Sequence, residues 1–433
     1  MRRAPSQVFA AVFVGAVAAA RAQDAATSAP SPASRPAAAA WVADLELLRT
    51  ELPRRHVDAF ARTAEADWRR AAEETSRRVL AECDADPEAA FVRLQAFTAT
   101  LGDPHTTLAP KAGGLVPPAT RLPAAAIWFR EGLHFWALPL DRAGFLARPV
   151  TAIGGVPFDE AAARLATVFA SDNASWRRKG VEDRVLDVAT LRACGLCGAD
   201  GATTFGVADA DGDVETLRLA PPRNAAEAKA IRFARKPDFA RFPPTNLVGR
   251  PPFGGRRLAD SATAFVWYDA CREDRPGALA AAIERLLGEF AAAQASGAAI
   301  DRLVVDLRRN LGGDSRLFRP FVDAYSDPKA RPPGGLFVLV GRNTYSSGVI
   351  NAWELKTRCG ATLVGEPTGG ALNGCGEIRS FDLPNVGATV FFSTKRFRFV
   401  EGEGRTLPPD VEVAVDAASF FAGRDPAFER AVR

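Results

Sequence analysis

Residues 336–350 read LFVLVGRNTYSSGVI, an apolar run that ends in a polar turn before apolar residues resume. A continuous run of five apolar residues, 336–340, is typical of a parallel strand that is buried on both faces. After the turn, Val349 and Trp353 follow at helical spacing. This stretch is therefore predicted to form a buried strand, a loop and the start of a helix.

The segments on either side repeat this alternation. Strand-like runs occur at 263–268, 303–307 and 362–364. The helical stripe between the first two runs consists of Leu279, Ile283, Leu286, Leu287 and Phe290. Successive strand–helix–strand units build a parallel sheet with helices on its faces. The predicted fold class is therefore α/β, with a core domain at 263–433.

The chain before this core divides into three regions. Residues 41–111 are expected to be helical, because apolar residues such as Leu94 and Phe97 recur at helical spacing between charged faces. Residues 112–222 carry short alternating apolar runs broken by glycine, which predict a small β-rich module. Residues 223–262 are rich in proline and are expected to be a linker or a segment that wraps the core.

The first 22 residues have the layout of a secretory signal peptide. Two arginines precede an uncharged apolar run at 8–20, and small residues stand before the expected cleavage at Gln23. A retained membrane span is not favoured, because such a span needs about 20 apolar residues. Residues 23–40, rich in Ala, Ser and Pro, are expected to be a flexible linker. The mature protein is expected to be periplasmic or secreted, without a membrane anchor.

The charge balance argues against a nucleic-acid partner. The chain has 55 Lys and Arg residues against 51 Asp and Glu residues, and three of the basic residues lie in the predicted signal peptide. The mature chain is therefore nearly neutral and lacks the basic footprint that a nucleic-acid-binding surface requires. No cofactor motif is recognised.

Six cysteines, an even number, suggest disulfides in an exported protein. Cys194 and Cys197 form a CxxC pair, a spacing that occurs in zinc half-sites, redox pairs and structural disulfides. A zinc site lacks a second ligand pair, and a redox site lacks its usual aromatic neighbour, so the disulfide is favoured. Cys359 and Cys375 flank a loop and are candidates for a second bridge.

Two loops at predicted strand ends are candidates for chemistry. Gly312 and Gly313 follow one strand, and their backbone N–H groups could stabilise an oxyanion, although a plain turn would use the same residues. Ser346 stands before the next helix, where free N–H donors and the helix dipole favour an alkoxide. An ordinary N-cap serine is the simpler alternative.

A serine nucleophile needs a base, and the chain has only three histidines. His56 follows two arginines at an expected helix end, and His134 lies on an alternating strand, so both are expected to be structural. His105 follows Asp103 and Pro104 in a turn, which can present an imidazole beside a carboxylate. His105 is therefore the leading candidate for a general base.

Five stretches of the chain, in order, resemble the motifs of the S41 family of serine peptidases, which includes the tail-specific (carboxy-terminal processing) proteases. They are LGDPHT at 101–106, VDLRRNLGG at 305–313, TYSS at 344–347, GEPTGG at 365–370 and LPPDV at 407–411. A weaker similarity near 150–165 resembles the PDZ-like module common in the family. The resemblance implies a ClpP/crotonase-like α/β core with a helical region and a PDZ-like module before it.

The same resemblance implies an acyl-transfer mechanism without a metal or cofactor. Ser346 would attack a peptide carbonyl, and the N–H groups of Gly312 or Gly313 and of Ser347 would stabilise the oxyanion. Tail-specific members pair the serine with a lysine, but Ala371 stands at the corresponding position. Lys356, ten residues past Ser346, is expected to point elsewhere.

Tricorn-type members of the family instead use a histidine at the position that resembles His105, assisted by a late glutamate. Glu401 is the predicted acid, with Glu403 and, less favoured, Asp103 as alternatives. The chain is therefore predicted to be a serine-type peptidase acting on a peptide or protein substrate. A catalytically inactive peptide- or ligand-binding protein and an esterase-like hydrolase are the alternatives.

Overall fold

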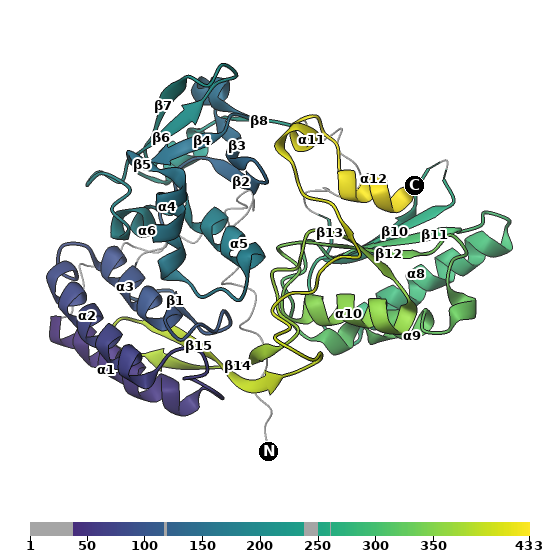
Figure 1. Ribbon diagram of the computed structural model, residues 1–433, viewed down its shortest axis with the longest axis horizontal. Coiled ribbons are helices and arrows are strands. Elements are labelled where there is room, and N and C mark those ends of the chain that lie inside the picture. The colour runs from purple at the N-terminus through teal and green to yellow at the C-terminus, as the bar shows by residue number, and fades with distance from the viewer. Residues whose placement is uncertain (1–37, 117–118, 238–249, 260) are drawn as a thin grey trace.

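The computed structural model describes residues 38–116, 119–237, 250–259 and 261–433, which form a helical region, a β-rich module and an α/β core (Figure 1). The predicted signal peptide and residues 23–37 of the predicted linker lie outside the described residues. Helix α1 (Ala38–Arg55) begins within the last three residues of that linker. Across the described parts of the chain, no helix is both long and apolar enough to span a membrane.

The core contains a six-stranded sheet in the order β16-β13-β12-β11-β10-β9. In that order the strands are β16 (Val411–Glu412), β13 (Thr362–Gly365), β12 (Leu336–Val340), β11 (Arg302–Asp306), β10 (Thr263–Tyr268) and β9 (Phe253–Arg257). All pairs are parallel except β9 with β10. The predicted α/β class is therefore confirmed, with an antiparallel strand added at one edge.

Helices cover both faces of this sheet (Figure 1). Helices α8 (Ala278–Ala295), α9 (Arg319–Ala324) and α10 (Ser347–Cys359) pack on one face, and α12 (Pro426–Val432) packs on the other. Alternate residues along each strand divide between the two layers, as expected of a sheet buried on both sides. For example, Val338 belongs to the first layer and Leu339 to the second.

The helical region consists of α1, α2 (Glu65–Glu82) and α3 (Pro87–Ala99), packed against a three-stranded sheet in the order β1-β15-β14. Strand β1 (Thr107–Pro110) follows the helices directly, whereas β14 (Gly374–Leu383) and β15 (Ala388–Phe397) come from far along the chain. The β14–β15 hairpin therefore leaves the core and completes the helical region.

The β-rich module contains two small sheets, β2-β3-β8 and β5-β4-β6-β7. Its strands are β2 (Ala125–Phe129), β3 (Gly132–Pro139), β4 (Val150–Ile153), β5 (Val156–Pro157), β6 (Thr203–Ala208), β7 (Val214–Leu219) and β8 (Phe233–Arg235). Its helices are α4 (Phe158–Leu165), α5 (Ala174–Arg184) and α6 (Val188–Ala193). Residues 223–262, expected to be a linker or a wrapping segment, contribute α7 (Ala225–Ala230), β8 and β9. Helix α11 (Ala417–Phe421) contacts Phe129 of the module from the core side.

The disulfide expected between Cys194 and Cys197 is wrong, because all six cysteines are free thiols. The Cys194 thiol is directed at the carbonyl of Arg164, and the Cys197 thiol at the carbonyl of Val188. Burial raises the pKa of Cys194 to about 11, so this thiol stays protonated near neutral pH. Cys359 and Cys375 are likewise unbridged.

Candidate active site

Ser346 occupies the turn between β12 and α10, as the N-cap residue of the helix. Its backbone has φ of 50° and ψ of −125°, a conformation that non-glycine residues rarely adopt. Two glycines make room for this turn. A Cβ added at Gly312 would lie 2.7 Å from the Ser346 Cβ, and one added at Gly370 would lie 2.8 Å from the Ser346 nitrogen. The strained serine is therefore held by close backbone neighbours on two sides.

Hydrogen bonds tie the serine turn to the two neighbouring loops. The Thr344 hydroxyl donates to the carbonyl of Leu307 (3.0 Å), and the Tyr345 N–H donates to the carbonyl of Asn310 (2.9 Å). On the other side, the Gly370 N–H donates to the carbonyl of Thr344 (3.0 Å). All three loops follow the carboxyl ends of parallel strands, where α/β sheets characteristically place their ligand sites.

Two backbone N–H groups near Ser346 are available to stabilise an oxyanion. The Gly312 N–H already donates to the Asn310 side chain (2.9 Å), which leaves Gly313 as the donor of this glycine pair. The N–H of Ser347 belongs to the first turn of α10, where helical partners are missing. The Ser347 hydroxyl donates to the Gly313 carbonyl (2.7 Å) and holds the two residues together. Within the described residues, neither the Gly313 N–H nor the Ser347 N–H makes a hydrogen bond.

His105 lies in the turn between α3 and β1 and packs against Tyr345, the residue before Ser346. The ring centroids are 4.8 Å apart, and the His105 Nδ1 lies 3.3 Å from the Tyr345 hydroxyl. The opposite ring nitrogen, Nε2, is buried and has no hydrogen-bond partner among the described residues. The structure thus brings His105 to the loop of Ser346, with one imidazole nitrogen unengaged.

His105 and Ser346 are not hydrogen-bonded to each other in the described part of the chain. They are linked instead through the Tyr345 side chain, which contacts His105 and immediately precedes Ser346. Catalytic hydrogen bonds are often long in the absence of substrate and tighten only in the complex. The arrangement is therefore compatible with a serine–histidine pair that closes when substrate binds.

The acid nearest to His105 is Asp103, whose Oδ1 lies 3.8 Å from the His105 Nδ1. Its carboxylate is buried and accepts hydrogen bonds from His56, Thr106 and Ser393. Burial opposes ionisation of Asp103, but the hydrogen bond from His56, the charge of His105 and the two hydroxyl donors outweigh it. Together they hold the pKa of Asp103 well below its usual range. The carboxylate beside His105 is therefore ionised.

The structure does not place Glu401, the predicted acid, against His105. Glu401 and Glu403 lie exposed in the loop after β15, and Glu403 pairs with Arg405 (3.0 Å). No contact joins either glutamate to His105 in the described residues. Of the three acids considered, Asp103, the least favoured from the sequence, is the one that the described residues place beside His105. Lys356 pairs with Asp410 and stays apart from the serine turn, as expected.

Helix α5 of the β-rich module supports the site from the other side. The Trp176 indole stacks on the Tyr345 ring with centroids 3.9 Å apart. The Asn173 side chain donates to the carbonyl of Gly369 (3.0 Å), in the loop beside Ser346. Since sequence patterns do not report contacts between distant elements, neither residue could be identified in advance.

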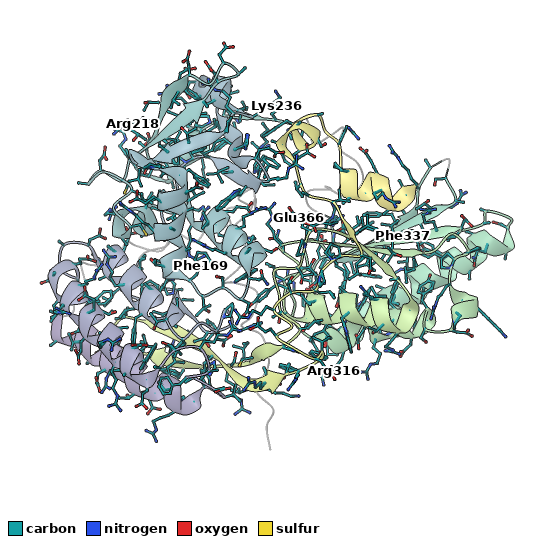
Figure 2. All side chains as sticks on the ribbon, viewed as in Figure 1. Phe169, Arg218, Lys236, Arg316, Phe337 and Glu366 are labelled. Carbon is teal, nitrogen blue, oxygen red and sulfur yellow. The ribbon has the colours of Figure 1, made fainter. Side chains whose placement is uncertain are left out.

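A buried ion cluster joins the same helix to the core. Arg342, four residues before Ser346, lies 2.5 Å from Glu182 of α5 and 3.2 Å from Glu366 of the core. Its guanidinium also donates to the carbonyl of Trp128. Glu366 lies on the side of the core that faces the β-rich module (Figure 2). The β-rich module and the serine loop are therefore held in one arrangement.

A cavity of about 250 Å³ lies between the helical region and the β-rich module. Pro104 and Thr106, which flank His105 in sequence, line it together with Trp176. Phe169, another lining residue, lies between the two regions (Figure 2). The cavity therefore lies between these two regions and is lined by the sequence neighbours of His105, not by His105 itself.

Two comparisons with known proteins bear on this site. The model of peptidase family S41 matches residues 319–413, a range that contains Ser346. The solved structure of mature CPAF complexed with lactacystin has a TM-score of 0.57 and 12% sequence identity, covering 89% of this chain and 96% of that chain. A CPAF mutant gives the same TM-score and identity, with 89% and 95% covered. At this identity the likeness to CPAF shows the fold alone.

The photosystem II D1 C-terminal processing protease is also similar, with a TM-score of 0.41, 15% identity and coverage of 92% of this chain and 96% of that chain. No curated protein sequence matches the chain. The family match covers the loop that carries Ser346, and the five sequence motifs agree with it. Residues 319–413 of this chain are therefore similar to peptidase family S41, a family of serine-type peptidases.

Proposed function

We propose that this protein hydrolyses peptide bonds with Ser346 as nucleophile and His105 as general base, oriented by Asp103. The observation that carries the proposal is the contact between His105 and Tyr345. This contact joins the histidine turn of the helical region to the serine turn of the core. A serine, an imidazole and an ionised carboxylate gathered in this way are the components of acyl-transfer catalysis.

In the proposed reaction, the Ser346 Oγ attacks the carbonyl carbon while its proton passes to the His105 Nε2. The oxyanion accepts hydrogen bonds from the N–H groups of Gly313 and Ser347. Asp103 stabilises the imidazolium through the Nδ1 side of the ring. The proton then passes to the departing amine, and water cleaves the acyl-enzyme by the same route in reverse.

The substrate of the proposed reaction is a peptide or protein. The predicted signal peptide supports export, so the enzyme would meet its substrates in the periplasm or outside the cell. Amino-terminal sequencing of the protein recovered from the exported fraction tests this location. Export predicts a chain that begins at Gln23, and an intact amino terminus in that fraction would contradict it.

The proposed function is tested by labelling the purified protein with a serine-reactive phosphonate, followed by peptide mapping. We expect label on Ser346 in the wild type and none in Ser346→Ala or His105→Ala. Ser326→Ala is the matched control, because its hydroxyl bonds only to the carbonyl of Asp323 on an exposed turn. A folded wild type without label would refute the peptidase.

Absence of label on the folded wild type would favour a catalytically inactive binding protein on the same scaffold. The observations that support this second candidate are Ala371 at the family lysine position and the open His105–Ser346 pair. Hydrolysis of small esters but not of peptides would instead identify an esterase. Parallel assays with a peptide and an ester of the same acyl group distinguish these outcomes.

A further inference from the structure

We propose that His56 is a positioning residue for Asp103, and through it for His105; this inference rests on the proposed function. His56 lies at the end of α1, where the sequence suggested only a structural role. Its imidazole and the Asp103 carboxyl are both buried, with side chains 2% and 8% exposed. The two histidines therefore share one carboxylate, which lies between them.

The two oxygens of Asp103 have different surroundings. Oδ2 accepts hydrogen bonds from the His56 Nε2 (2.9 Å), the Thr106 hydroxyl (2.7 Å) and the Ser393 hydroxyl (2.6 Å). Oδ1 accepts the backbone N–H of His105 (3.1 Å) and faces its Nδ1. One oxygen is thus fixed by three donors, and the other is directed at the predicted base.

The second ring nitrogen of His56 determines where its proton lies. The Nδ1 accepts a hydrogen bond from the Asp58 backbone N–H (3.0 Å), so the proton of the neutral ring resides on Nε2. Protonation of Nδ1 would break that hydrogen bond. His56 therefore directs its Nε2–H to Oδ2 of Asp103 while its Nδ1 acts as an acceptor, which leaves Oδ1 facing His105.

Other charged groups around this pair are already engaged. Arg62 forms an ion pair with Asp172, and Arg396 pairs with the Asp58 side chain. The thiol of Cys375 lines a small cavity together with His56 and Asp103. Burial raises its pKa to about 11, so the thiol is protonated near neutral pH. His56 is thus the nitrogen donor whose side chain contacts the Asp103 carboxylate from outside the 103–106 turn.

The position of His56 depends on two distant parts of the chain. Its N–H donates to the carbonyl of Leu52 at the end of α1, and the next residue, Val57, donates to the carbonyl of Ser393 (3.0 Å). Ser393 is the same residue whose hydroxyl binds Asp103. Helix α1 and β15 therefore hold the acid jointly, and the helical region contributes directly to the proposed catalytic group.

The test is an NMR titration of the imidazole signals, which three histidines make easy to assign. We expect His56→Ala to lower the titration midpoint of His105 by about one pH unit, because Asp103 loses its orientation. His56→Gln places an amide donor near the position of Nε2 and should restore the wild-type midpoint. His56→Lys puts a cation beside Asp103 and should lower the midpoint as His56→Ala does. His134→Gln, a change at a buried histidine outside the site, should leave it unchanged.

Peptidase kinetics provide the second readout. His56→Ala should reduce kcat about tenfold with little change in KM, and His56→Gln should recover most of that loss. Equal midpoints for His105 in the wild type, His56→Gln and His56→Lys would overturn the inference. These two variants still decide the question if His56→Ala does not fold. The titration midpoint of His105 can be measured without turnover, so it tests the role of His56 alone. Absence of phosphonate labelling would refute the peptidase as a separate result.

Discussion

The Trp176 indole stacks on the phenol ring of Tyr345, with planes 15° apart, so that a helix of the β-rich module supports the residue before Ser346. The His105 ring also packs against Tyr345, with ring centroids 4.8 Å apart. Three regions of the chain thus meet at one tyrosine. The position of Ser346 therefore depends on all of them.

Removal of this stack should impair catalysis more than folding. We expect Trp176→Ala to lower kcat/KM by at least about tenfold, because small displacements of reacting groups are costly. Trp176→Phe retains an aromatic face and should recover most of the activity. The measurement is kcat/KM together with the rate of phosphonate labelling. Equal activity in Trp176→Ala and the wild type would show that Tyr345 is held without the indole.

The space around Ser346 is tested by a pair of glycine substitutions. A Cβ at Gly370 would lie 2.8 Å from the Ser346 nitrogen and 2.6 Å from Val349, so Gly370→Ala should displace the serine turn. We expect a loss of about 1–3 kcal/mol in the free energy of unfolding and near-complete loss of labelling. Gly374→Ala is the control, because nothing lies within 4 Å of its added Cβ. Full labelling of Gly370→Ala would contradict the close packing.

Asp103 should make the stability of the protein depend on pH in acid. Its folded-state pKa lies below the unfolded value, so its ionisation stabilises the fold above that value and the contribution is lost as pH falls. Asp103→Asn removes this contribution. The difference in free energy of unfolding between wild type and variant should therefore shrink from about pH 5 to about pH 2.

Urea denaturation at a series of pH values measures this difference. Asp274→Asn, at an exposed acid, is the control and should follow the wild type throughout. A constant difference between the wild type and Asp103→Asn over this range would show that folding leaves the pKa of this carboxyl unchanged. The same variant should also lose most peptidase activity, since His105 loses its neighbouring charge.

Removing only the cation of the ion cluster at Arg342 should destabilise the fold more than removing all of the charges of the cluster. Arg342→Met leaves Glu182 and Glu366 buried without their cation, and we expect it to destabilise the fold by about 3–5 kcal/mol. Adding Glu182→Gln and Glu366→Gln removes the buried charges and should recover part of that loss. Arg316→Met, which breaks an exposed pair with Asp314, should cost less than about 1 kcal/mol. Similar denaturation midpoints for Arg342→Met and Arg316→Met would contradict this account.

The loops of the site were predictable because local patterns encode them. The apolar run at 336–340 predicts β12, and the residues after it predict a turn at Ser346 and a following helix. The glycine pair at 312–313 and the histidine turn at 103–105 are equally local. Since strand ends of one parallel sheet meet at one edge, the core loops could be brought together by pattern alone.

The acid that we propose for the site, Asp103, is positioned by contacts that no local pattern records. The Asp103 carboxylate is bound by His56, 47 residues earlier, and by Ser393, 290 residues later. The family resemblance directed attention to a late glutamate instead, which led to Glu401. The contribution of α5 was missed for the same reason, because Trp176 meets Tyr345 only after the β-rich module has folded against the core.

The β14–β15 hairpin has a consequence for how the protein is made. Strand β1 pairs with β15, so the sheet that packs against the amino-terminal helices cannot be completed before residues 388–397 have been synthesised. Ser393 arrives with that strand, and so does its hydrogen bond to Asp103. A nascent chain that ends before β15 therefore lacks a finished acid beside His105. The hydrogen-bonded surroundings of Asp103 are therefore completed only late in synthesis, by a segment far along the chain from the helices that they adjoin.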